Sequence, residues 1–311
     1  MTKSPVLLNY FALSNGKQLL IGGHICLTAM RNFRFDRFNT IKTVRSLLNL
    51  YFVKACSERK ITLNYGDQKL ELETNKYGYF ETTIEHVHDY DELKSINLSE
   101  KNKTVHIPPE NFSLHTTNVD SSELLISDID DTVLETNISN TIKKLHSILF
   151  TKVERRKTVD DVYNWIKNFA KEGNQVCYVS NSEQNLYPLI YHFLRSNSFP
   201  QGPLFLKFFR SWTDLLLGKK KPSGKVHKLD TLSKLASMFS HSEITLLGDN
   251  TQEDFSIYLE IANRYPESIC RIIIREVLQN GEDKKKIEGL RDKLKEKEIQ
   301  LYYQPNMEDL I

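Results

Sequence analysis

Two carboxylates stand two residues apart at the end of a short apolar run: Asp128 and Asp130, within the stretch ISDIDDT at 126–132. Alternate residues of a β-strand point to the same face, so these carboxylates would lie close together where the strand stops. In open α/β sheets, ligands bind at that carboxyl edge. Two neighbouring anions need a cation between them, or one of them must hold a proton. Because both arrangements serve catalysis, this stretch is the first candidate for a catalytic or metal-binding site.

Further polar groups follow other apolar runs in the same way. Ser180 directly follows a second apolar run, and Asp249 follows another, with Asp254 five residues later. A basic stretch at 219–228 lies between these two runs. Because parallel strands end at the same edge of a sheet, carboxylate, hydroxyl and ammonium groups are expected to converge there.

The second half of the chain alternates apolar runs of strand length with stretches of helical periodicity. Strands are expected at 124–127, 176–179, 204–209, 244–247, 269–274 and 299–303. Helices are expected at 159–171, 184–195, 226–239, 252–263 and 284–297. This alternation predicts an α/β fold with a Rossmann-like parallel sheet covered on both faces.

Residues 1–118 are instead rich in short strands. Asn15-Gly16 is a strong hairpin signal between two apolar runs. Four more strands are expected at 47–53, 61–65, 69–74 and 79–84. The spacing predicts a small β-sandwich accessory domain over 1–118, followed by the α/β domain over 119–311.

Composition sets further bounds. The chain has 311 residues, of which 40% are hydrophobic and 26% charged, so a packed core is expected rather than disorder. A net charge of +2 does not indicate a nucleic-acid partner, and none is expected. The four cysteines lack zinc-site spacing and are expected to be reduced. With no signal peptide or membrane-length apolar run evident, the sequence favours a cytoplasmic protein.

The ordered set of motifs resembles the haloacid-dehalogenase superfamily of phosphohydrolases. A narrower resemblance, over about 122–305, is to the actin-patch-type phosphatidate phosphatase catalytic domain. It rests on six blocks, which are 128–132 (DIDDT), 179–188 (VSNSEQNLYP), 199–203 (FPQGP), 227–228 (HK), 247–262 (beginning LGDNTQED) and 271–277. The resemblance implies a magnesium-dependent phosphatase.

The resemblance also implies roles for the acidic residues. Asp128 would be the nucleophile that forms an aspartyl-phosphate. Asp130 would protonate the leaving oxygen and then activate water. Mg²⁺ would be held by Asp128, the backbone carbonyl of Asp130, and Asp249, with Asp254 either a ligand or an orienter of bound water.

The same resemblance assigns the remaining polar groups. Ser180 would hydrogen-bond a phosphoryl oxygen, and Lys228 would neutralise the phosphate, with Lys225 as the alternative lysine. The chain departs from the family at Glu183-Gln184, where Pro-Trp is usual, and at Asn250-Thr251, where Ser-Gly is usual. These departures remove no catalytic group, although Glu183 adds negative charge near the phosphate.

The substrate class is inferred from charge and periodicity. A small helical insertion near 135–158 carries an apolar stripe. Residues 143–157 have a net charge of +5 and residues 207–228 of +6. Basic groups beside an apolar helix face fit a phosphorylated lipid such as phosphatidate, and peripheral contact with an anionic membrane.

Two alternatives stay open at this point. The first is a phosphatase of a soluble phosphomonoester, such as a sugar phosphate, a nucleotide or a nucleic-acid end. The second is a non-catalytic membrane- or partner-binding module on a phosphatase scaffold. The sequence does not indicate an oligomeric state.

Overall fold

The computed structural model describes residues 3–28, 53–85, 92–99, 103–108, 114–119, 123–129, 156–208, 223–250, 253–277, 281–305 and 307. The chain divides into two compact units. The first comprises Met1–Asn118, Ser182–Asn197 and Leu206–Pro222, and the second comprises Val119–Asn181, Ser198–Phe205 and Ser223–Ile311. The domain boundaries inferred from the sequence remain a prediction.

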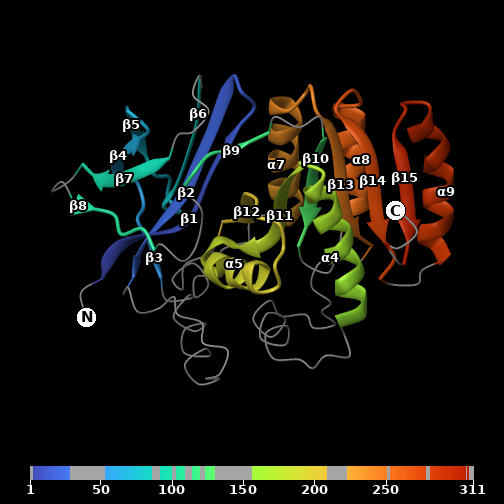
Figure 1. The fold of residues 1–311 in the computed structure, drawn as a ribbon, viewed down its shortest axis with the longest axis horizontal. Helices are drawn as coiled ribbons and strands as arrows, with labels where there is room; N and C mark the ends of the chain where they lie inside the picture. The colour runs from blue at the N-terminus through green and yellow to red at the C-terminus, as the bar shows by residue number, and fades with distance from the viewer. Residues whose placement is uncertain are drawn as a thin grey trace. The chain divides into compact units, whose positions relative to one another are not determined.

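The second unit is built on a six-stranded sheet with the strand order β12-β11-β10-β13-β14-β15 (Figure 1). The strands are β10 (Glu123–Asp128), β11 (Gln175–Glu183), β12 (Leu204–Lys207), β13 (Glu243–Asp249), β14 (Ile269–Arg275) and β15 (Gln300–Gln304). The pairs β10–β11, β10–β13, β13–β14 and β14–β15 are all parallel. The predicted α/β fold with a parallel sheet is therefore confirmed.

Four helices accompany this sheet within the described residues: α4 (Arg156–Lys171), α7 (Gly224–Met238), α8 (Asp254–Arg264) and α9 (Gly281–Lys295). Helix α4 lies on one face and α7 and α8 lie on the other (Figure 1). Right-handed crossovers require this arrangement, because the chain moves outward from β10 to β11 and later proceeds in the opposite direction from β13 to β14. Helix α8 packs against α7, β13 and β14, and α9 packs against β15.

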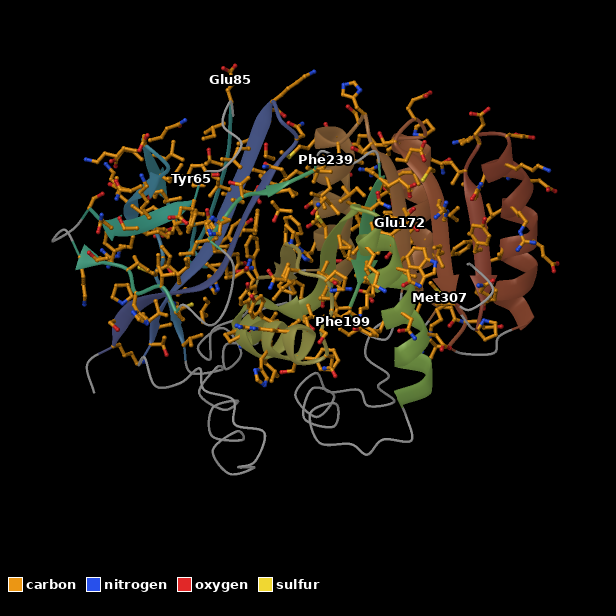
Figure 2. The ribbon with its side chains drawn as sticks, viewed as in Figure 1. Tyr65, Glu85, Glu172, Phe199, Phe239 and Met307 are labelled. Atoms are coloured by element: carbon orange, nitrogen blue, oxygen red, sulfur yellow. The ribbon has the colours of Figure 1, made fainter. Side chains whose placement is uncertain are left out.

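The core of this unit consists of strands that are apolar on both faces. Residues 124–126, 246–247 and 272–274 are at most 1% exposed. Such continuous apolar runs are typical of parallel strands with helices on both sides. An aromatic pair joins α4 to the loop before β12, where Phe199 contacts Tyr163 edge to face with ring centroids 5.0 Å apart (Figure 2).

The strand order places a switch point at the carboxyl end of β10. From β10 the chain adds β11 and β12 on one side, and it then returns to add β13 on the other side. The connections on the two sides of β10 leave in opposite directions at this edge. Open α/β sheets bind ligands at such a point. The residues that end β10 and β13 are therefore the first candidates for a ligand-binding site.

The first unit contains two further sheets. One has the order β3-β2-β1-β9, with β6 also paired to β2, and the other has the order β5-β4-β7-β8. Their bounds are β1 (Ser4–Ser14), β2 (Gln18–Thr28), β3 (Lys54–Ala55), β4 (Lys60–Tyr65), β5 (Gln68–Glu73), β6 (Tyr79–Glu85), β7 (Leu93–Leu98), β8 (Lys103–Thr104) and β9 (Thr117–Asn118). All the pairings are antiparallel except β1–β9. Face-to-face packing of the two sheets as a sandwich remains a prediction.

The predicted hairpin at Asn15-Gly16 is confirmed. Strands β1 and β2 pair in register from Ser14↔Leu19 outward, and the Asn15 Oδ1 accepts hydrogen bonds from the N–H groups of Lys17 and Gln18. Both strands are almost wholly buried. Helix α5 (Tyr187–Ser196) packs against β1 within this unit, which gives one apolar strand face its cover.

One expected element differs from the structure, and two others lie mostly outside the described residues. The helix expected at 184–195 is a 3₁₀ turn, η4 (Gln184–Leu186), followed by α5, because Pro188 lacks an N–H donor and favours the first turn of a new helix. The strand expected at 47–53 lies outside the described residues, apart from Val53, which directly precedes β3. The insertion near 135–158 also lies outside them, apart from 156–158, which open α4. In the part of the chain that the structure describes, none of the helices is long and apolar enough to cross a membrane.

Candidate active site

Three aspartates converge at the switch point of the parallel sheet. Asp128 ends β10, Asp249 ends β13 and Asp254 is the first residue of α8. Each offers a carboxylate oxygen, and these oxygens all lie within 4.8 Å of one another. Their side chains are at most 1% exposed. Buried carboxylates at such distances repel one another strongly, so the cluster needs nearby positive charge.

The convergence arises where the strands end. Ser127 is the register partner of Leu247, so Asp128 lies beside Gly248 and Asp249 comes one residue later. Gly248 leaves room for the groups that arrive from α8. A Cβ atom built on it would lie 2.8 Å from the Tyr258 hydroxyl and 2.9 Å from the Asp254 Oδ2. A glycine at position 248 therefore allows the Asp254 carboxylate to approach the end of β13, next to both Asp128 and Asp249.

A buried lysine completes the cluster. The Lys228 Nζ lies 2.9 Å from the Asp128 Oδ1 and also forms an ion pair with Asp254. The Lys228 side chain is 1% exposed, whereas Lys225, one turn earlier in α7, is only partly buried. Of the two candidate lysines, the structure therefore places Lys228 among the carboxylates.

Helix α7 carries Lys228 to this position from a fixed starting point. The Ser223 hydroxyl accepts a hydrogen bond from the Val226 N–H and caps the helix. A Cβ atom on Gly224, the first helical residue, would lie 2.7 Å from the Asn181 Oδ1, so the helix begins against the chain that follows Ser180. This close contact sets where α7 starts and so which of its turns reaches the sheet edge.

The donor set fits a divalent cation. Three carboxylates suit hard ions, which take oxygen ligands. Asp128, Asp249, Asp254 and Lys228 together carry two more negative charges than positive ones when all are ionised. A divalent cation would offset that excess, and the three aspartates therefore form a cluster that could hold a metal ion.

Two residues without an assigned role also lie at this edge. The Tyr258 hydroxyl donates a hydrogen bond to the Leu247 carbonyl at 2.9 Å. Burial, followed by the charges of Asp254, Asp128 and Asp249, raises the pKa of Tyr258 well above its usual value. Arg275 is the register partner of Asp249 and is 2% exposed.

The sequence analysis gave neither residue a role, although both lie inside motif blocks of the family resemblance, at 247–262 and 271–277. Arg275 ends an apolar run just as Asp249 does, so the same signal was available for it. Tyr258 carried only helical spacing from Asp254, which is a weaker signal.

The remaining predicted residues stand as follows. Ser180 is buried in β11, one residue beyond Val179, which is the register partner of Asp128. Asp130 lies outside the described residues. The catalytic and metal-binding roles assigned from the sequence remain predictions for every residue of the set.

Comparison with known proteins bears on the same segment. Residues 124–276 match the family model described as the catalytic domain of phosphatidate phosphatase APP1. An uncharacterized protein of Schizosaccharomyces pombe is 28% identical over 157 residues, which cover 50% of this chain and 25% of that protein. Phosphatidate phosphatase APP1 of Saccharomyces cerevisiae is 28% identical over 152 residues, which cover 49% of this chain and 25% of that protein. The matched regions thus span about a quarter of the length of these curated relatives.

The solved structures resemble this chain only weakly. A carbohydrate acetylesterase from Xanthomonas citri is 8% identical, with 88% of this chain and 68% of that chain covered, at a TM-score of 0.26. The family match, by contrast, contains all four residues of the buried cluster, namely Asp128, Lys228, Asp249 and Asp254. The family resemblance inferred from the motifs is therefore confirmed over residues 124–276, which match the model of the phosphatidate phosphatase APP1 catalytic domain.

Proposed function

We propose that this protein is a magnesium-dependent phosphatase of the haloacid-dehalogenase type. It hydrolyses a phosphomonoester, with phosphatidate or a related phospholipid as its substrate and diacylglycerol as the product from phosphatidate. The observation that carries the proposal is the buried cluster of Asp128, Asp249 and Asp254 with Lys228, inside the segment that matches the phosphatidate phosphatase family.

Mg²⁺ is the proposed metal because its preference for carboxylate oxygens matches the donor set. The residues that would hold it are Asp128, Asp249 and Asp254, whose carboxylate oxygens lie within 4.8 Å of one another, together with the backbone carbonyl of Asp130. When bound, the ion supplies positive charge that neutralises and orients the phosphate.

The proposed reaction runs in two steps on the side chains of this protein. The Asp128 carboxylate attacks phosphorus, a P–O bond forms to Asp128, and the bond to the leaving alkoxide breaks while Asp130 donates its proton to that oxygen. Asp130 then removes a proton from water, and this water attacks the aspartyl-phosphate. Inorganic phosphate leaves and Asp128 returns to its carboxylate form.

Lys228 and Ser180 have supporting roles in this scheme. The ammonium of Lys228, 2.9 Å from the Asp128 Oδ1, stabilises the charged form of the nucleophile and holds it in place. Since phosphoryl transfer depends mostly on positioning and charge neutralisation, this is a direct contribution to the rate. Ser180 would donate a hydrogen bond to a phosphoryl oxygen.

The lipid substrate rests on the family and on the charge of the sequence. The Saccharomyces cerevisiae relative bears the name phosphatidate phosphatase. The basic, partly apolar segments at 143–157 and 207–228 fit an anionic headgroup at a membrane surface, although most of their residues lie outside the described ones. A cytoplasmic protein in peripheral contact with membranes follows from this proposal.

The test is a substrate screen with purified protein, with and without Mg²⁺. Phosphate release from phosphatidate in mixed micelles is compared with release from sugar phosphates, nucleotides and 5′-phosphorylated oligonucleotides. We expect Mg²⁺-dependent release that favours phosphatidate. Asp128→Asn is expected to lower kcat by at least about 10³-fold, because the amide cannot form the covalent intermediate.

A matched variant controls for the loss of an aspartate. Asp292→Asn changes an exposed aspartate of α9 and should leave turnover unchanged. Faster release from a soluble phosphate would replace the lipid by that substrate class. Binding to anionic vesicles without any phosphate release would favour a non-catalytic module. Full activity of the Asp128→Asn variant would remove Asp128 from the nucleophile role.

A further inference from the structure

Asn250 directly follows Asp249 and connects the ends of three strands. Its backbone N–H donates to the Arg275 carbonyl at 3.2 Å, where β14 ends. Its side-chain Oδ1 accepts a hydrogen bond from the Val277 N–H at 2.8 Å, just beyond β14. Its Nδ2 donates to the Tyr303 hydroxyl on β15 at 3.1 Å. One asparagine thus ties the chain leaving β13 to the end of β14 and, one strand further, to β15.

These bonds lie where the regular ladder stops. Asp249, paired with Arg275, is the last residue of the β13–β14 register. Among the described residues, the register of β13 with β14 includes no pair beyond this one. The cluster nevertheless requires an oxygen of Asp249 within 4.8 Å of oxygens from Asp128 and Asp254. The hydrogen bonds of Asn250 restrain the backbone directly after Asp249, and so help to fix where the Asp249 carboxylate points.

We propose that Asn250 is a positioning residue for the metal site, acting through Asp249. The inference rests on the proposed function, because it takes the aspartate cluster to be a metal site. Asn250 acts indirectly, since its Oδ1 is engaged by the Val277 N–H and its Nδ2 by Tyr303. Groups that orient metal ligands typically change metal affinity about ten- to a hundredfold when they are removed.

The experiment measures metal binding directly, without substrate. The dissociation constant for Mg²⁺ and for Mn²⁺ is determined by calorimetry on the full chain, and the unfolding midpoint is measured in EDTA and in saturating Mg²⁺. We expect Asn250→Ala to weaken metal binding about tenfold. Tyr303→Phe removes only the partner on β15 and should weaken binding by a smaller factor. The double variant should resemble Asn250→Ala, because both changes break the same connection.

A matched control separates positioning from general loss of stability. Tyr178→Phe removes the hydrogen bond from the Tyr178 hydroxyl to the Pro200 carbonyl, which lies in the same unit away from Asn250. This variant should lower the unfolding midpoint in EDTA while leaving the metal dissociation constant unchanged. A positioning role also predicts that Asn250→Ala recovers most of its kcat at saturating Mg²⁺.

The possible outcomes separate the positioning role of Asn250 from the metal site on which it depends. If the unaltered protein binds neither ion, both the metal site and the role of Asn250 are wrong. If it binds metal and the Asn250→Ala and Tyr303→Phe variants bind it equally well, only the positioning role is wrong. Should Asn250→Ala fail to fold, Tyr303→Phe alone decides between these results.

Discussion

Replacement of Lys228 by methionine tests the electrostatic balance of the cluster. The lysine ammonium is 1% exposed, lies 2.9 Å from the Asp128 Oδ1 and also pairs with Asp254. Removing one partner of a buried ion pair typically costs about 3–5 kcal/mol, because the remaining charge stays buried and uncompensated. We therefore expect Lys228→Met to lower the free energy of unfolding in EDTA by about 3–5 kcal/mol.

Metal should reduce that loss. Without the lysine charge, a divalent cation meets less repulsion at the cluster, so the variant should bind Mg²⁺ more tightly. Binding to the native state stabilises it by RT ln(1 + [L]/Kd), which is about 2.7 kcal/mol at a hundredfold excess over Kd. The stability gap between the variant and the unaltered protein should therefore narrow as the Mg²⁺ concentration rises.

Urea unfolding in EDTA and at several Mg²⁺ concentrations measures both effects. The fluorescence of Trp165 in α4 reports on the unit that holds the site. Lys225→Met is the matched control, because Lys225 lies on the same helix but is only partly buried, and it should change stability by less than about 0.5 kcal/mol. The electrostatic reasoning would be refuted if Lys228→Met were as stable in EDTA as Lys225→Met. It would also be refuted if the stability difference between Lys228→Met and the unaltered protein did not change with the Mg²⁺ concentration.

Three further outcomes are expected. Gly248→Ala places a Cβ atom 2.8 Å from the Tyr258 hydroxyl, so it should cost about 1–3 kcal/mol in urea unfolding and weaken Mn²⁺ binding in calorimetry, since Asp254 must shift. Tyr258→Phe removes the hydrogen bond to the Leu247 carbonyl and should cost about 1 kcal/mol in the same unfolding assay. Burial lowers the pKa of His24 from 6.5 to about 4, against a smaller opposing effect of its hydrogen bond to a backbone carbonyl. Protonating His24 in the folded protein therefore costs about 3 kcal/mol, so stability is unaffected above pH 6.5 and falls as the pH drops towards 4. Urea titrations should show a smaller fall in stability over this pH range for His24→Gln.

The sequence predicted the elements of the second unit because their signals are local. Uninterrupted apolar runs marked β10, β13 and β14, and helical periodicity marked the helices between them. Because parallel strands end at one edge of a sheet, the sequence alone also predicts that Asp128 and Asp249 lie together. Asp254 and the basic stretch at 219–228 were placed near the same edge, and the family motif at 227–228 then favoured Lys228 within that stretch.

The remaining features depend on tertiary contacts. Strand order is set by which faces pack together, so the central place of β10 could not be read from the sequence. Because Ser127 pairs with Leu247, Asp249 lies one residue further along its strand than the neighbour of Asp128, and this offset is set by the strand register rather than by a local motif. Likewise, α5 covers β1, a contact between segments far apart in the sequence.

The central place of β10 has a consequence for synthesis. The strand that carries Asp128 emerges from the ribosome long before its neighbour β13, which carries Asp249, and before the helix that begins at Asp254. Domains generally fold as whole units during translation, and pairings between distant segments form late. A nascent chain that ends before α8 lacks one of the three acidic groups, so Asp128, the proposed nucleophile, should remain inert until nearly the whole polypeptide has been made.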